Sequence, residues 1–83
     1  MKTYSFILYK NVEHNNDFIM ACIIKFCKID SFAAEQCILI MNNANKCFIK
    51  IGSKNELCLI KHKFDKLNFK SKIKEYVPSN VHE

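Results

Sequence analysis

Five cysteines are the residues of this 83-residue sequence best suited to metal binding or nucleophilic catalysis. They are spaced 5, 10, 10 and 11 residues apart, so the sequence has neither a C-x-x-C pair nor the Cys/His spacing of zinc sites. Each has apolar neighbours, among which a free cysteine packs as a small hydrophobic residue. We therefore predict reduced thiols, no metal, no cofactor and a cytoplasmic protein. The five are Cys22, Cys27, Cys37, Cys47 and Cys58.

The three histidines give no stronger indication of catalysis. His14 lies in the polar segment NVEHNN, and we expect an exposed loop side chain; contact with the amine of a ligand is the alternative. His62 is expected on a lysine-rich surface, and His82 in a frayed C-terminal tail. No histidine has a cysteine or an acidic residue at a chelating interval, and no Ser/His/Asp or Cys/His set can be assembled. We expect a non-enzymatic protein without catalytic residues.

The composition indicates one small folded domain over residues 1–83, with an ordered core of about 3–78. Apolar residues make up 49% of the chain, charged residues 25%, and Gly and Pro occur once each. A chain this short has a thin core and little room for an active-site cleft, which favours a binding module. No apolar run is long enough for a signal-peptide core or a membrane span.

The basic charge is carried entirely by lysine. Thirteen lysines against eight acidic residues give a net charge of +5, and arginine is absent. Arginine is the better bidentate ligand for phosphate and guanine, so an all-lysine surface is a weak nucleic-acid signal. We interpret the lysines as a solvated surface and expect no nucleic-acid partner. A small nucleic-acid-binding α/β domain is the alternative, which salt-dependent binding of DNA or RNA would support.

Hydrophobic periodicity predicts six elements in the order β-α-α-β-α-β. Strands are expected over residues 4–10, 46–51 and 72–77, and helices over about 17–28, 31–43 and 54–67. Asp17 is predicted to cap the first helix or to lie in its first turn, Asp30 or Ser31 to cap the second, and Ser53 to begin a capping box with Glu56. Three helices on one face of a three-stranded antiparallel sheet would bury the apolar stripes together, as an α+β sandwich.

Three details of this prediction concern packing. The strand over 46–51 alternates, with Cys47, Ile49 and Ile51 expected on the buried face. The stripe of the third helix is expected to contain Leu57, Ile60, Phe64 and Leu67. We interpret five asparagines as turn and cap residues; the alternative is that they form a polar rim over an apolar pocket. The five are Asn15, Asn16, Asn42, Asn43 and Asn45.

The ordered series of segments resembles ClpS, the small adaptor family of Clp proteases, over about residues 4–76. The chain has Ile7-Leu8-Tyr9 followed by Lys10-Asn11-Val12 where the family has I-L-Y-N-D-D, and Asp17-Phe18-Ile19 where its first helix begins with D/E-F-V. The resemblance is greatest to forms from Bacteroidetes, which share A-E-Q-C at residues 34–37 and K-C at residues 46–47, and it also includes Gly52.

This resemblance implies a monomeric adaptor that binds proteins whose first residue is large and hydrophobic. The adaptor then docks on the N-terminal domain of a ClpA- or ClpC-type unfoldase and delivers the substrate. Such recognition needs acceptors for an α-ammonium and an apolar pocket for the first side chain. The resemblance places Ile19, Ile38 and Met41 at the pocket positions, although periodicity alone would assign all three to the core.

The chain departs from the family at the polar positions. The N-D-D loop becomes Lys10-Asn11-Val12, and a family histidine late in the second helix becomes Asn42. Losing a charge-assisted contact costs about 1.5–3 kcal/mol, or roughly tenfold to a hundredfold in affinity. Two adaptor hypotheses therefore stand: an altered pocket that still recognises N-terminal residues, and a diverged ClpS-like module without such recognition that binds or inhibits an unfoldase or another protein.

Overall fold

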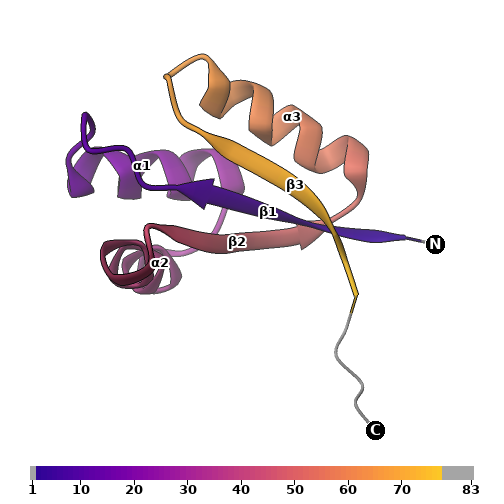
Figure 1. Cartoon of the computed structure of the whole chain (residues 1–83), viewed down its shortest axis with the longest axis horizontal. Helices are drawn as coiled ribbons and strands as arrows, with labels where there is room; N and C mark the ends of the chain where they lie inside the picture. Colours follow the sequence, from indigo (N-terminus) through magenta and orange to yellow (C-terminus); the bar gives the residue numbers. More distant parts are fainter. Residues whose placement is uncertain (1, 78–83) are drawn as a thin grey trace, which may run out of the picture.

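The elements follow one another in the predicted order β-α-α-β-α-β. A computed structural model describes residues 2–77. Its helices and strands are β1 (Thr3–Tyr9), α1 (Asn16–Cys27), α2 (Ser31–Ala44), β2 (Lys46–Gly52), α3 (Lys54–Asp65) and β3 (Ser71–Tyr76), as Figure 1 shows. The predicted strands agree with these bounds to within one residue. The third helix is shorter than predicted, because it ends at Asp65 and leaves Leu67 in the following turn.

Local side-chain hydrogen bonds determine where the helices begin. The oxygens of Asn15, Asp30 and Ser53 accept hydrogen bonds from the backbone N–H three residues on, at 2.7–3.1 Å. The caps at Asp30 and Ser53 were expected, whereas Asn15 replaces Asp17, which lies in the first turn of α1. Left-handed residues end two helices: Lys28 with φ 59° after α1 and Asn45 with φ 66° after α2.

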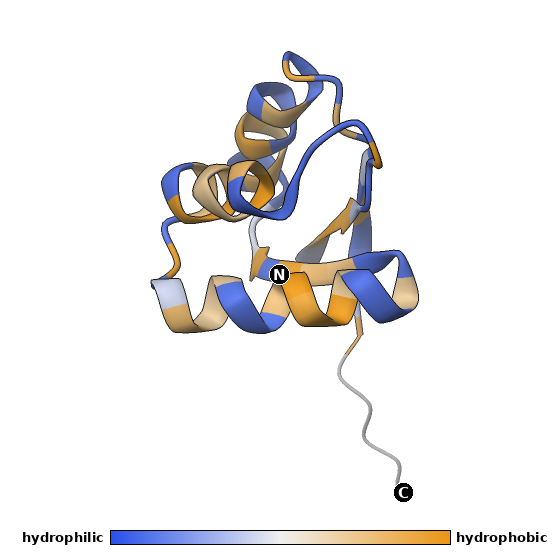
Figure 2. Ribbon diagram, turned by 90° about the vertical axis from the view of Figure 1, so that its left-hand side faces the viewer, coloured by the Kyte–Doolittle hydropathy of each residue, from blue (hydrophilic) through white to orange (hydrophobic). Residues whose placement is uncertain are grey.

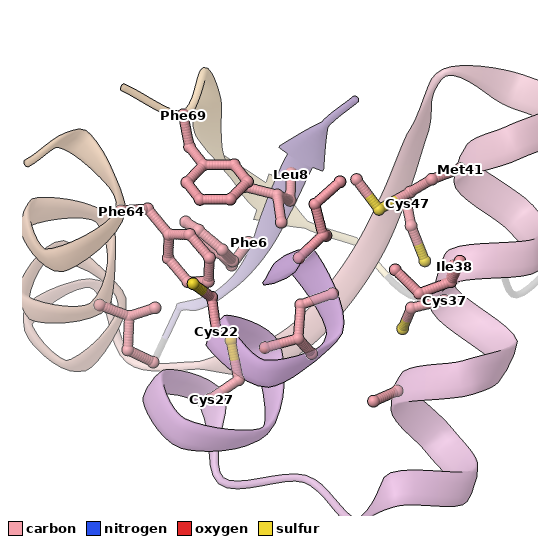
Figure 3. Packing of buried hydrophobic residues seen from close by; sticks show 14 of the residues in the cluster. Phe6, Leu8, Cys22, Cys27, Cys37, Ile38, Met41, Cys47, Phe64 and Phe69 are labelled. Atoms are coloured by element: carbon pink, nitrogen blue, oxygen red, sulfur yellow. The ribbon is translucent and has the colours of Figure 1, made fainter. Parts of the chain in front are cut away.

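The sheet is antiparallel, with strand order β2-β1-β3 (Figure 1). Phe6 and Leu8 of the central strand are fully buried and join residues of all three helices in one core cluster (Figure 3). The helices therefore cover one face of the sheet, as predicted. Along the helices hydrophilic and hydrophobic residues alternate (Figure 2), which is the pattern of helices that pack on one side only.

The strand β2 does not alternate regularly. Its register with β1 shifts between Phe6 and Ile7, so Lys50 pairs with Phe6 and Phe48 with Ile7. This irregularity reverses the alternation beyond Ile49. Consequently Ile51 is half-exposed, which corrects the prediction that it faces the core. Lys50 turns toward the helices instead, where its ammonium donates to the Cys27 carbonyl at 3.1 Å and lies 3.4 Å from the Glu56 carboxylate.

An aromatic cluster fills the core between the sheet and α3. The ring of Phe64 lies 5.2–5.4 Å from the rings of Phe6, Phe26 and Phe69. Phe69 lies in the turn before β3 and is buried, although no periodic pattern assigned it to the core. Within residues 2–77, no helix is both long enough and apolar enough to cross a bilayer.

Candidate functional site

The loop that joins β1 to α1 meets the C-terminal end of α2. The backbone N–H of Lys10 donates to the carbonyl of Asn45 at 2.8 Å, and this bond fixes the start of the loop against the end of the helix. On the other side, Asn11 donates from its side-chain amide to the carbonyl of Asn68 at 2.8 Å. Hydrogen bonds therefore connect this short loop to the end of α2 and to the turn before β3.

The side chains of Lys10 and Asn42 contact each other directly. Lys10 Nζ donates to Asn42 Oδ1 at 2.8 Å, across 32 residues of sequence. Sequence reasoning assigned both residues to the same polar site but did not predict their bond. The ammonium of Lys10 thus already occupies the side-chain oxygen of Asn42, a hydrogen-bond acceptor where the β1–α1 loop meets α2. A second ammonium brought to the same oxygen would be repelled by Lys10.

The side chain of His14 is half-buried, which corrects the prediction that it is exposed. Its Nε2 lies 2.9 Å from the carbonyl of Leu67 and must donate, because a carbonyl oxygen only accepts. Its ring packs 4.4 Å from Phe69 and 4.9 Å from Phe18, centroid to centroid. The histidine therefore anchors the loop to the turn before β3. His62 is exposed, as expected, and His82 lies outside the described residues.

The predicted pocket residues belong to the core. Ile19 is 1% exposed, Met41 1% and Ile38 8%, and all three are members of the buried cluster (Figure 3 labels Ile38 and Met41). The backbone N–H of Ile19 donates to the Asn15 carbonyl, which places this residue one turn into α1. All three side chains are therefore covered by the surrounding structure.

Two of the five asparagines, Asn15 and Asn45, are cap residues, as interpreted from the sequence, whereas Asn16, Asn42 and Asn43 lie within helices. Asn15 caps α1, Asn45 ends α2, and Asn43 donates from its side-chain amide to the carbonyl of Leu39 at 3.1 Å. Asn42 differs, because its oxygen accepts from Lys10. Such a bond between two segments leaves no local pattern in the sequence.

The cysteines show no sign of a reactive or metal-binding arrangement. All five are free thiols; four are buried, and Cys58 is exposed, contrary to the expectation that it packs as a hydrophobic residue. Burial raises the pKa of Cys27 and of Cys47 to about 12, and it also raises the pKa of Cys22. Among residues 2–77, no group of three or more Cys, His, Asp or Glu side chains could hold a metal ion.

The fold is that of a solved Clp adaptor. A search of solved structures finds the Agrobacterium tumefaciens protein ClpS2, solved with L-phenylalaninamide bound, at a TM-score of 0.81. The match covers 90% of this chain and 98% of that chain at 6% sequence identity. No family model and no curated protein matches the sequence. At this identity the comparison establishes the ClpS-like α+β fold, which confirms the fold class predicted from the sequence.

Proposed function

We propose that this protein is a cytoplasmic, monomeric adaptor that delivers substrates to a Clp-family ATP-dependent unfoldase. The observation that carries the proposal is the fold, which matches ClpS2 over nearly the whole length of both chains. The proposal agrees with the resemblance of residues 4–76 to the adaptor family, which is greatest to Bacteroidetes forms. The partners would be the N-terminal domain of a ClpA- or ClpC-type unfoldase and the N-termini of substrate proteins, with no chemistry by the adaptor itself.

The site for a substrate N-terminus would be the junction of the β1–α1 loop with α2. L-phenylalaninamide, the molecule bound to ClpS2, carries a free α-ammonium and a benzyl group. In this chain the corresponding ligand would use Ile19, Ile38 and Met41 for its side chain. These side chains are buried, so the surrounding structure would have to move for the ligand to enter.

One observation favours the second candidate, a ClpS-like module that binds an unfoldase without recognising N-terminal residues. Lys10 already places an ammonium on Asn42 at 2.8 Å. A substrate ammonium would have to displace this group and remain close to a like charge, without either loop carboxylate of the family. The two candidates share the unfoldase as partner and differ in whether the junction binds a free N-terminus.

Two binding measurements test the proposal. The first is calorimetric titration of the protein with isolated N-terminal domains of ClpA- and ClpC-type unfoldases. The second is fluorescence polarisation with labelled peptides that begin with Phe, Leu, Tyr or Trp. The same peptides with an acetylated N-terminus, and peptides that begin with Ala, are the controls.

Three patterns of results distinguish the candidates. Binding of both the unfoldase domain and the unblocked peptides supports the complete adaptor. Binding of the unfoldase domain alone supports the second candidate. No binding of either, with the protein shown to be folded by circular dichroism, contradicts both.

A further inference from the structure

The sheet face opposite the helices has its own apolar and basic surface. The strand pairing shows which side chains lie on this face. One row across the three strands contains Ile51, Ser5 and Lys74. The next contains Phe48, Ile7 and Lys72. Phe6 and Leu8, which alternate with Ser5 and Ile7 on β1, point to the core, so both rows lie on the face that the helices leave open. Ser5 and Ile7 are themselves only 2% and 3% exposed, so the accessible surface of this face consists of side chains of β2 and β3.

This face has a hollow at the end of β3. The hollow has a volume of about 330 Å³ and is lined by Ser5, Phe48, Lys74, Glu75, Tyr76 and Val77. Large apolar side chains around it are exposed: 58% for Phe48, 50% for Ile51 and 74% for Val77. The volume is at the lower end of the range for ligand pockets, which suits one bulky side chain better than a whole small molecule.

Two lysines of β3 lie beside the hollow. Lys72 and Lys74 are exposed on the same face of β3, and strand geometry separates their Cα atoms by roughly 7 Å. Glu75 also lines the hollow, but its carboxylate is paired with the ammonium of Lys2, 3.9 Å away. An extended segment with acidic residues at alternate positions has the same 7 Å repeat and the opposite charge.

We propose that the open face of the sheet, from Lys72 and Lys74 to the hollow beside Phe48, binds an extended acidic protein segment. Carboxylates at alternate positions of that segment pair with the two lysines. A bulky apolar side chain two residues further on enters the hollow between Phe48 and Tyr76. This arrangement has the apolar centre and charged rim of a protein–protein interface.

A protein segment fits this surface better than a single-stranded nucleic acid. Nucleic-acid platforms present aromatic rings on which successive bases stack. Here the rings of Phe48 and Tyr76 flank one hollow, aliphatic Ile51 and Val77 occupy much of the remaining exposed apolar surface, and the cations are lysines, which do not offer the planar fork of arginine. The open face shares no residue with the junction of Lys10 and Asn42, so the proposal does not depend on the proposed function.

The test uses a labelled peptide of the sequence Glu-Thr-Glu-Thr-Phe-Thr, acetylated and amidated so that it presents no free ammonium. Two control peptides replace either both Glu by Lys or the Phe by Ala. Fluorescence polarisation at low salt should give saturable binding of the first peptide by the full chain. Each control peptide should bind about tenfold more weakly or worse.

Variants locate the binding on the surface. Phe48→Ser and Lys74→Glu should each weaken binding about tenfold, because both residues are exposed and their replacement leaves the core intact. Leu59→Ser and Lys63→Glu are matched controls on α3, where both side chains are exposed, and should leave the affinity unchanged. Circular dichroism confirms that all four variants are folded.

Several results would overturn the proposal. These are no saturation by the acidic peptide, equal loss in the α3 control variants, or displacement of the peptide by a uridine oligonucleotide that itself binds more tightly. A dimer in sedimentation analysis that Phe48→Ser dissociates would assign the face to a second copy of the chain. Tighter peptide binding after removal of residues 78–83 would assign it to the chain's own C-terminal segment.

Discussion

Replacement of Lys10 by Asn tests whether its ammonium decides what the loop–α2 junction can bind. The ammonium lies 2.8 Å from Asn42 Oδ1, so a ligand ammonium that shares this oxygen would approach it to about 4 Å. Two like charges at that distance repel by about 1 kcal/mol in water and about 4 kcal/mol at a protein surface. Lys10 is half-buried, and we therefore expect a gain near the lower limit, about tenfold in affinity.

The assay is fluorescence polarisation with a peptide that begins with Phe, at low and at moderate salt. Lys10→Asn should bind about tenfold more tightly than the natural chain at low salt, and the difference should shrink as salt screens the charges. Lys54→Asn is the matched control, because Lys54 is exposed at the start of α3, near Tyr4 at the opposite end of β1. Equal affinities for the natural chain and Lys10→Asn, or an equal gain in Lys54→Asn, would refute the electrostatic argument.

Further predictions concern stability and thiol chemistry. Phe64→Ala should lower the free energy of unfolding by about 3–5 kcal/mol, measured by urea denaturation, because three rings lose their central partner; a loss below 1 kcal/mol would contradict the packing. Asn15→Ala should cost about 1 kcal/mol through loss of the α1 cap, whereas Asn15→Ser should cost much less. A thiol reagent at pH 8 should modify Cys58 rapidly and the buried cysteines only after unfolding; several fast thiols would show that the core opens. Burial raises the pKa of Cys27 and Cys47 from 9.0 to about 12, so folding favours their neutral forms. The free energy of unfolding should therefore be constant below about pH 8 and decrease from about pH 9 toward 12. An unchanged urea midpoint between about pH 9 and 12 would disprove this prediction.

Much of the fold could be predicted from the sequence because its determinants are local. A strand such as β1 shows its apolar residues within a few positions, and the caps at Asp30 and Ser53 depend on bonds to residues three positions away. The order of elements and the side on which the helices pack follow from these patterns. The end of the third helix was predicted two residues too late. α3 ends at Asp65 because the chain turns to pack Phe69 against Phe64.

The site was predicted only in part. The resemblance assigned Lys10 and Asn42 to one polar region, and the structure joins them by a hydrogen bond. The anchoring of His14 on the Leu67 carbonyl was missed, because it links segments 53 residues apart and neither residue has a distinctive local pattern. The exposed apolar surface around Phe48 was also missed.

By itself the sequence determined the order of the helices and strands and the caps at Asp30 and Ser53, since each of these depends on residue types and short spacings. Tertiary structure alone decided the β2 irregularity that exposes Ile51 and turns Lys50 toward the helices. It also decided that the ammonium of Lys10 rests on Asn42 and that lysines of β3 flank the hollow beside Phe48. These features arise from pairing between strands and loops far apart in the chain, where register and side-chain direction depend on how the whole core packs.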